Sequence, residues 1–305
     1  MADSSHALFA FGTLLDPDVQ AGLFGRPVPT RSASLAGCRL VDVQITDPRV
    51  IALSGLAVHR GLKRDAAGSV PGGVLFLDDA QLASADAYEV SAYARRRVHL
   101  TDGMSVWAYL AANPFVAAER IAVIGDSIAY GRCDPSGGWA QRLAAHHVAA
   151  DEASHRVFAL AIPGQRLDAL RPHLDEVVRR RPDTVVVAAG INDLAGAGGA
   201  ASTPDDLLAE VEALCTDLEG HDIRPVVVTP LWVDEAAARE DLGLTVTVDA
   251  VVAYRSTLMA WAERTHRDVL DLWPVSEGRP DLLVDGVHPG PEGHQALWER
   301  LRVSA

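Results

Sequence analysis

From residue 119 onward the chain alternates short runs of valine, isoleucine and leucine with longer segments of helical periodicity. The apolar runs are RIAVIG, HRVFALAI, DTVVVAAG, RPVVVTP and DVLDLW. Helices are predicted over GGWAQRLAAHHVAA, LDALRPHLDEVVRR, TPDDLLAEVEALCTDLEG, DAVVAYRSTLMAWAERTH and GPEGHQALWERL. Apolar runs bounded by helices indicate parallel strands that are buried on both faces. The alternation therefore predicts a flavodoxin-like, doubly wound α/β domain over residues 119–305, with ligands bound at the carboxyl ends of its strands.

Residues 6–112 have a different pattern, in which short β-prone segments are separated by turn residues. Strands are predicted in HALFAFGTLL, SLAGCRLVDVQI, RVIALSGLAVH, GGVLFLDD, RRRVHLT and SVWAYLAA, and helices only near LDPDVQAGLF and DAQLASADAYEV. This pattern favours a small, mostly antiparallel β domain. Residues 113–118 are expected to form a short linker, which contains a proline but no glycine/serine run and so is not a long flexible tether.

The amino-acid composition argues against several classes of function. The net charge of −14 disfavours a nucleic-acid partner, and Lys63 is the only lysine, so Schiff-base chemistry has almost no candidate. The three cysteines, Cys38, Cys133 and Cys215, are widely spaced, so neither a disulfide framework nor a zinc knuckle is indicated. No apolar run approaches 18 residues and the first residues lack a basic segment. We expect a cytoplasmic protein with no membrane partner, no metal and no organic cofactor; the oligomeric state is left open.

The stretch IAVIGDSIAYG places a serine where the first strand of the α/β domain ends. Gly125 allows the backbone to bend sharply there, and Ser127 follows at the position where such folds carry out chemistry. A helix beginning at the serine would direct backbone N–H groups toward developing negative charge. A serine hydroxyl is a weak nucleophile until a base takes its proton, so the rest of the chain must supply that base.

The stretch VDGVHPG offers an acid and a histidine just before the final helix. Asp285 and His288 are three residues apart, so the carboxylate can hold one imidazole nitrogen while the other faces Ser127. His294 lies six residues later inside a helical pattern and has no acid three residues before it. We therefore prefer His288 as the base.

Two further stretches offer donors for a negatively charged oxygen. Gly164 in AIPGQRL ends the second predicted strand, where its N–H can approach a substrate carbonyl. Asn192 in AAGINDL ends the third, and its amide can donate another hydrogen bond. Each stretch alone is more often an ordinary turn or loop, but all four in this order favour a catalytic site.

In this order the four stretches resemble the SGNH hydrolases, also called the GDSL esterase/lipase superfamily, over residues 119–304. The family's blocks correspond to Gly125–Ser127, Gly164, Gly190–Asp193 and Asp285–His288, whereas Ala159 replaces the asparagine that usually precedes the glycine block. The resemblance implies Ser127 as nucleophile, His288 as base and Asp285 as the residue that orients it. It also implies an oxyanion hole made by the N–H groups of Ser127 and Gly164 and the side chain of Asn192.

The N-terminal half resembles the gamma-glutamylcyclotransferase-like family over roughly residues 6–112. The matching stretches are FAFGTLLDPDVQAGLFGRP and ADAYEVSAYARRRV. The resemblance implies that Glu89 transfers protons and that a loop binds the glutamyl group through its backbone. That loop comprises Phe11, Gly12, Thr13 and Leu14, with Phe11 replacing the family's tyrosine. The alternative is that Glu89 is a solvated acid at a helix end, in a domain kept for binding or packing.

These features together predict an enzyme, a serine hydrolase of the esterase, deacylase or amidase type. Its substrate would be a small-molecule acyl ester or amide, cleaved through an acyl-enzyme on Ser127. The N-terminal domain would add a second, gamma-glutamyl cyclotransferase activity. Two alternatives stay open: a cyclotransferase whose SGNH domain is accessory, and a binding module without catalysis. The sequence does not identify the acyl group or the leaving group.

Overall fold

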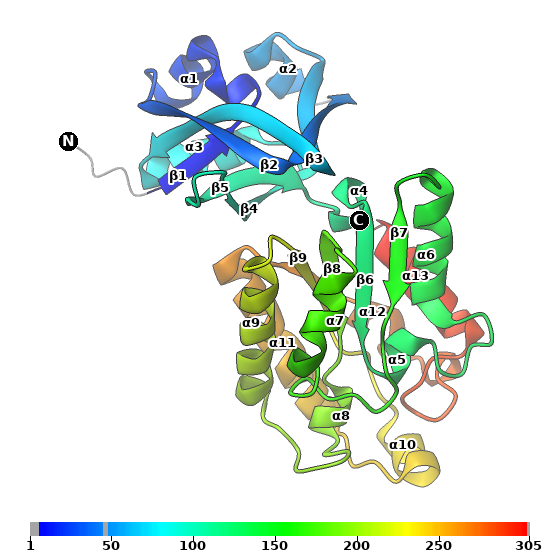
Figure 1. Ribbon diagram of the computed structural model, residues 1–305. Coiled ribbons are helices and arrows are strands. Elements are labelled where there is room, and N and C mark those ends of the chain that lie inside the picture. The colour runs from blue at the N-terminus through cyan, green and yellow to red at the C-terminus, as the bar shows by residue number, and fades with distance from the viewer. Residues whose placement is uncertain (1–5, 45–47, 304–305) are drawn as a thin grey trace. The chain divides into compact units, whose positions relative to one another are not determined.

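The computed structural model describes residues 6–44 and 48–303 (Figure 1). The chain divides into two compact units, Met1–Ala117 and Ala118–Ala305. The division falls inside the segment expected to be a linker, of which residues Pro114–Ala117 form the short helix α4. Within the described residues, no helix combines the length and the apolar character needed to span a membrane.

The second unit is built on a five-stranded sheet in which every pairing is parallel. Its strands are β6 (Arg120–Gly125), β7 (Arg156–Ala159), β8 (Thr184–Ala188), β9 (Arg224–Val228) and β10 (Asp268–Leu270). Their order in the sheet is β10-β9-β8-β6-β7, which counted from β6 is the flavodoxin-like order 2-1-3-4-5. The predicted doubly wound fold is thereby confirmed. The order reverses between β6 and β8, and folds of this kind bind ligands at that reversal.

Helices cover both faces of this sheet, as the continuous apolar character of its strands requires. On one face α7 (Leu174–Arg179), α9 (Pro204–Glu219) and α11 (Val248–Thr265) share a core with the buried valines of β8. On the other face α6 (Gly138–Ala150) packs against α13 (Pro291–Val303), as Figure 1 shows. Local signals set the start of α9: Thr203 and Asp206 form a capping box, and Pro204 is the first helical residue.

The first unit contains a second five-stranded sheet, with the order β2-β3-β1-β5-β4. Its strands are β1 (His6–Ala10), β2 (Thr30–Gln44), β3 (Val58–Leu77), β4 (Tyr93–His99) and β5 (Ser105–Ala111). Among the described strands of this sheet, only the β1–β5 pairing is parallel, so the expected mostly antiparallel domain is confirmed. Alternate residues of β1 face opposite cores. Leu8 packs with helices α1 (Pro17–Phe24), α2 (Pro48–Ser54) and α3 (Asp79–Tyr88), and Phe9 packs on the other face.

Two predicted elements are wrong. Residues 49–59 were expected to form a strand, but residues Pro48–Ser54 form α2, which starts at a proline and ends before Gly55 in the left-handed conformation. Short apolar runs do not distinguish strand from helix, and these end signals decide the matter here. Residues 167–180 were expected to form one helix, but only 174–179 are α-helical because Pro172 interrupts the ladder. The expected strand over 34–45 ends at Ile45, outside the described residues.

Several short helices lie in the connections, and sequence periodicity did not predict them. They are η1 (Thr13–Leu15), α5 (Ser127–Tyr130), α8 (Ile191–Leu194), α10 (Glu235–Leu242), α12 (Trp273–Ser276) and η3 (Pro280–Leu282), whereas η2 (Arg171–His173) lies within the helix expected over 167–180. Helices of three to eight residues hold too few apolar positions to show a helical period. Of these, α5 and α8 directly follow the adjacent strands β6 and β8, and they carry two of the candidate site residues.

Candidate active site

Ser127 is the first residue of α5, immediately after strand β6. Gly125 adopts a φ of 151°, and a side chain there would overlap the carbonyl oxygen of Ala188 on β8. Asp126 caps α5, because its Oδ1 accepts the N–H of Ile128 at 2.9 Å. Each residue of the GDS stretch therefore has a physical role. Gly125 allows strands β6 and β8 to approach closely, Asp126 caps helix α5, and Ser127 presents its hydroxyl at the start of that helix.

A chain of hydrogen bonds joins Ser127, His288 and Asp285. The hydroxyl oxygen of Ser127 lies 2.7 Å from Nε2 of His288. The other ring nitrogen, Nδ1, lies 2.8 Å from Oδ2 of Asp285. Asp285 Oδ1 also accepts the backbone N–H of His288 at 2.9 Å, so this carboxylate is fixed by the turn that carries the histidine. In this arrangement the ring can donate to the carboxylate at Nδ1 while Nε2 accepts the serine proton.

The surroundings keep His288 neutral and Asp285 ionised near neutral pH. Burial lowers the pKa of His288, and the hydrogen bond and negative charge of Asp285 oppose this without overcoming it. Burial alone would raise the pKa of Asp285, but hydrogen bonds from the backbone and ring of His288 bring it below its ordinary value. A neutral imidazole held by an ionised carboxylate is the state that a general base requires.

His294, the other histidine considered from the sequence, has a different environment. It is fully buried, and its Nδ1 accepts the backbone N–H of Trp139 at 3.4 Å. Its Nε2 lies 3.2 Å from the carbonyl oxygen of Arg132. His294 therefore joins α13 to the start of α6 and to the segment after α5, and the geometry supports the choice of His288 instead.

Asn192 lies in α8, which follows strand β8, and its side chain is buried. Its amide donates to the carbonyl oxygen of Gln165 at 3.0 Å, which ties it to the loop that contains Gly164. An amide NH₂ has two donors, so one remains for a ligand. Gly190, just before α8, has a φ of 128°, and a side chain there would press on the ring of Tyr254.

The loop after β7 carries the second expected donor, Gly164. Where the related family usually has an asparagine, Ala159 is exposed, and the loop is held by Asn192 and Asp193 from α8 instead. Asp193 accepts the N–H of Leu167 at 3.2 Å. Among the described residues, neither the Gly164 N–H nor the Ser127 N–H has an acceptor. Both groups are therefore available to hydrogen-bond a ligand oxygen.

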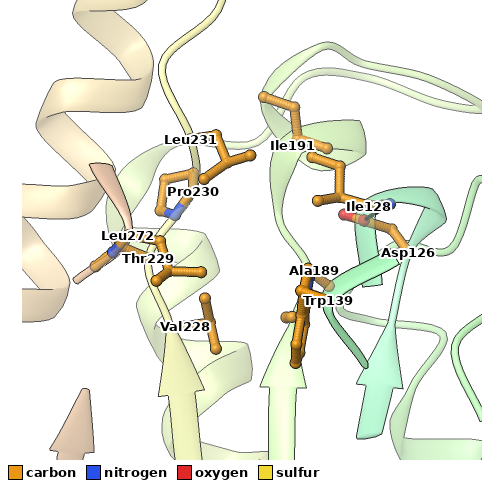
Figure 2. A pocket seen from close by; sticks show the side chains of 11 residues that line it. Asp126, Ile128, Trp139, Ala189, Ile191, Val228, Thr229, Pro230, Leu231 and Leu272 are labelled. Atoms are coloured by element: carbon orange, nitrogen blue, oxygen red, sulfur yellow. Dashed lines mark hydrogen bonds between the residues drawn. The ribbon is translucent and has the colours of Figure 1, made fainter. Parts of the chain in front are cut away.

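A small pocket, partly open to solvent, lies at the carboxyl ends of β8 and β9. Figure 2 shows Pro230 and Leu231 on one side of it, facing Ile128 and Ile191 on the other. The remaining lining residues are Asp126, Trp139, Ala188, Ala189, Val228, Thr229 and Leu272. The lining is mostly apolar, and its walls include both chain neighbours of Ser127 and the residue before Asn192. Ser127, His288 and Asn192 do not themselves line this space, which could hold an apolar group.

In the first unit, the loop and the acid expected to act together are brought close. Thr13 Oγ1 lies 3.0 Å from the hydroxyl of Tyr88, the residue before Glu89, although 75 residues separate them. Burial, together with the charge of Asp86, raises the pKa of Glu89 to about 7. A carboxyl group that titrates near neutrality can both take and return a proton. Phe11, in contrast, packs its ring on Phe9, with 6.1 Å between centroids.

Tyr93 is a candidate site residue that the sequence did not single out. Its hydroxyl is buried and has no hydrogen-bond partner among the described residues, and burial, with the charge of Glu89, raises its pKa to about 12. Tyr93 lies four residues after Glu89, and this spacing within AYEVSAYAR was the only available signal. The walls contributed by residues 228–231 were also missed, because nothing local marks an apolar loop as a pocket.

Comparison with known families gives two matches along the chain. The model of the GDSL-like lipase/acylhydrolase family matches residues 123–296. The model of the gamma-glutamyl cyclotransferase, AIG2-like family matches residues 8–139. A search of curated proteins finds no match. The predicted order of the two families along the chain is confirmed.

Solved structures similar to this chain are hydrolases. A lipase/acylhydrolase from Enterococcus faecalis is 21% identical, with a TM-score of 0.51 over 61% of this chain and 94% of that one. An α/β hydrolase from the metagenome of Lake Arreo, Spain, is 20% identical, with a TM-score of 0.50 over 61% and 94%. An acetylxylan esterase from Geobacillus stearothermophilus is 20% identical, with a TM-score of 0.50 over 61% and 93%. At these identities the similarity establishes the fold.

Proposed function

Because the chain belongs to the GDSL-like lipase/acylhydrolase family, we propose that its α/β unit is a serine hydrolase. The substrate would be a small-molecule ester or amide, cleaved through an acyl-enzyme on Ser127. The observation that carries this proposal is the continuous hydrogen-bonded path from the Ser127 hydroxyl through His288 to Asp285, with distances of 2.7 and 2.8 Å. The three residues come from two distant parts of the chain. The direction of the hydrogen bonds, from the serine hydroxyl to the ring and from the ring to the carboxylate, suits removal of the serine proton.

In the first half of the reaction, His288 Nε2 takes the hydroxyl proton while Ser127 Oγ attacks the substrate carbonyl carbon. The resulting oxyanion accepts hydrogen bonds from the Ser127 N–H, the Gly164 N–H and the second amide hydrogen of Asn192. The protonated His288 then gives its proton to the leaving alcohol or amine, and the acyl group remains on Ser127. Asp285 stabilises the transient imidazolium throughout.

In the second half, water attacks the acyl-enzyme, with His288 Nε2 taking its proton. The acid product departs as the proton returns to Ser127 Oγ. Both halves use protein groups and water alone. The apolar pocket would receive the acyl chain, because its lining includes Asp126 and Ile128, the two chain neighbours of Ser127.

The test is turnover of a panel of p-nitrophenyl esters and N-acyl amides by wild type and Ser127→Ala. We expect ester hydrolysis that disappears in the variant, with circular dichroism spectra that coincide. A fluorophosphonate probe should label the wild-type protein and leave Ser127→Ala unlabelled. A wild-type protein that neither turns over any panel member nor reacts with the probe would favour the alternative of a binding module.

A second activity, gamma-glutamyl cyclotransfer in the first unit, is favoured by the environment of Glu89. Burial raises the pKa of Glu89 to about 7, and its chain neighbour Tyr88 contacts Thr13 of the expected glutamyl-binding loop. Glu89 would accept a proton from the substrate α-amine as that amine attacks its own γ-carbonyl. It would then protonate the departing amine, so 5-oxoproline and a free amine form with no net proton change.

Glu89→Gln separates this activity from the hydrolase because it keeps the size of the side chain and removes its titrating proton. We expect wild type to release 5-oxoproline from γ-glutamyl amines, and the variant to lose this release while keeping ester hydrolysis. If the wild type forms 5-oxoproline but hydrolyses no ester or amide, the cyclotransferase is the principal enzyme and the α/β unit is accessory. Absence of 5-oxoproline from a broad panel would leave the first unit without this activity.

A further inference from the structure

Cys133 lies beside the pair Asp285 and His288, although more than 150 residues separate them along the chain. The Cys133 sulfur, a carboxylate oxygen of Asp285 and a ring nitrogen of His288 all lie within 4.8 Å of one another. Asp285 and His288 are buried, and Cys133 is half-buried. Widely spaced cysteines indicated no metal site in the sequence, and tertiary structure alone assembles these donors.

The segment that carries Cys133 is fixed on both sides. The N–H of Arg132 donates to the carbonyl oxygen of Ser127 at 2.9 Å, and the N–H of Asp134 donates to Gly131 at 3.1 Å. The carbonyl oxygen of Arg132 also contacts the buried His294. The sulfur is therefore held near Asp285 and His288 rather than on a free loop.

A thiolate, an imidazole and a carboxylate are the donors that bind zinc. Zn²⁺ holds sulfur at about 2.3 Å and nitrogen or oxygen at about 2.0–2.2 Å, so tetrahedral ligand atoms are roughly 3.3–3.6 Å apart. Side-chain movements of about 1 Å would bring the three donors to that spacing. The two anionic donors would neutralise a divalent ion, and water would complete the coordination. Mg²⁺ and Ca²⁺ prefer all-oxygen sites and do not fit a site with sulfur.

We propose that Cys133, Asp285 and His288 form an inhibitory site for a thiophilic divalent cation such as Zn²⁺. Binding releases the thiol proton of Cys133 to solvent. If Nδ1 of His288 is the ligand, the ring proton moves from Nδ1 to Nε2, so the neutral ring has no free lone pair facing Ser127, and the ion replaces the hydrogen bond to Asp285. If Nε2 is the ligand, the lone pair that would accept the Ser127 proton is occupied. In both cases His288 no longer serves as the base.

The charge of Arg132 acts against this cation, because it is felt at both Cys133 and His288. Its side chain is exposed, so solvent and salt screen the repulsion. Arg132 also hydrogen-bonds Cys133 and opposes the rise in the pKa of its thiol that burial causes, which favours the thiolate ligand, so Arg132→Gln should change the affinity for Zn²⁺. A site elsewhere on the protein would not respond to this substitution.

This proposal rests on the proposed hydrolase function, so Zn²⁺ binding is measured first by a method that does not depend on enzyme activity. Ser127→Ala, which carries no nucleophile, should still bind one Zn²⁺ at this site by calorimetry and show a raised melting temperature. Cys133→Ser in the same background should weaken that binding at least about tenfold, as expected for loss of a ligand. Failure of binding in Ser127→Ala would overturn the metal site and leave the hydrolase untouched.

Inhibition provides the second readout, each variant being compared with its own metal-free rate. ZnCl₂ or CdCl₂ should suppress ester hydrolysis by the full chain, EDTA should restore it, and equal MgCl₂ should have no effect. Cys133→Ser should need at least about tenfold more Zn²⁺ for half inhibition. His146→Ala, which removes an exposed histidine elsewhere, should behave as wild type. Equal sensitivity of wild type and Cys133→Ser would overturn the proposal.

Discussion

The hydroxyl oxygen of Ser127 lies 2.7 Å from Nε2 of His288, across a separation of 161 residues along the chain. A single turn, running from Asp285 to His288, supplies both the imidazole and the carboxylate that orients it. Small displacements of this turn relative to α5 would therefore break the contact, which makes the pair a sensitive target for substitution.

Removing either member of the pair should abolish ester hydrolysis without unfolding the protein. We expect Ser127→Ala and His288→Ala each to lower kcat by at least about 10³-fold, because groups that act as a unit lose most of their effect together. His294→Ala is the matched control, with a loss below about tenfold in the folded fraction. Steady-state kinetics on a p-nitrophenyl ester measures all three, and a larger loss in His294→Ala than in His288→Ala would reverse the assignment.

The pH dependence should follow His288. A base works only when neutral, and the pKa of His288 is lowered from its ordinary value of 6.5. We therefore expect kcat/KM to stay high down to pH 6.5 and to fall only as the pH drops further, through the ionisation of the folded enzyme. Asp285→Asn should shift this acid limb to still lower pH, since it removes the negative charge that favours the imidazolium. A wild-type midpoint above pH 7 would contradict the assignment.

Asn192→Ala should slow acyl transfer while leaving ester binding nearly intact. Loss of one oxyanion donor typically costs about 10²–10³-fold in kcat. The same substitution removes the bond to the Gln165 carbonyl, so a small fall in melting temperature should accompany it. Asn192→Asp distinguishes the two effects, because it fills the same space and presents an acceptor that repels the oxyanion. Unchanged kcat in Asn192→Ala would remove this residue from the proposed oxyanion hole.

Filling the pocket should change the preferred acyl chain. Ala189 lines the pocket at the end of β8, and leucine there would occupy space that we assign to the acyl group. Each methylene displaced from an apolar site costs about 0.8 kcal/mol, so Ala189→Leu should lower kcat/KM for butyrate relative to acetate esters by about tenfold. Ala209→Leu, on the exposed face of α9, is the matched control. An unaltered ratio in Ala189→Leu would place the acyl chain elsewhere.

At the opposite end of the sheet, Arg224 and Asp268 form a buried bidentate ion pair between the starts of β9 and β10. The guanidinium Nε and Nη2 lie 2.6 and 3.0 Å from the carboxylate oxygens. Arg224→Met leaves a buried carboxylate without this cation and should lower the free energy of unfolding by about 3–5 kcal/mol in urea titrations. Adding Asp268→Leu should recover much of that loss. A single variant as stable as wild type would contradict this account.

Sequence patterns predicted what depends on local order along the chain. The alternation of apolar runs and helical segments after residue 119 predicted the parallel sheet, and the ends of its predicted strands indicated Ser127 and Asn192 as site residues. Two predictions failed where local signals conflicted. For residues 49–59 we followed the apolar run and predicted a strand, although a proline and a glycine flank what is in fact helix α2. For residues 167–180 we followed the helical period and predicted one helix, although Pro172 interrupts it. In both cases Pro or Gly was the more reliable signal.

What escaped prediction depends on contacts between distant segments. The approach of Cys133 to Asp285 is an example, since no spacing rule connects them. The pocket is another, because its walls come from the ends of several strands and from the loop at Pro230 and Leu231. Tyr93 is intermediate: its position in the sequence was visible, but the burial of its hydroxyl, without a partner in residues 6–44 and 48–303, emerges only from the packing of the first unit.

The turn that carries His288 follows every strand of its sheet in chain order. During synthesis, a ribosome would therefore release Ser127, Gly164, Asn192 and all five strands before it releases His288. A domain begins to fold as its residues emerge, at about 5–20 residues per second. Under the proposed mechanism, Ser127 would therefore have no base to activate it until this closing turn docks.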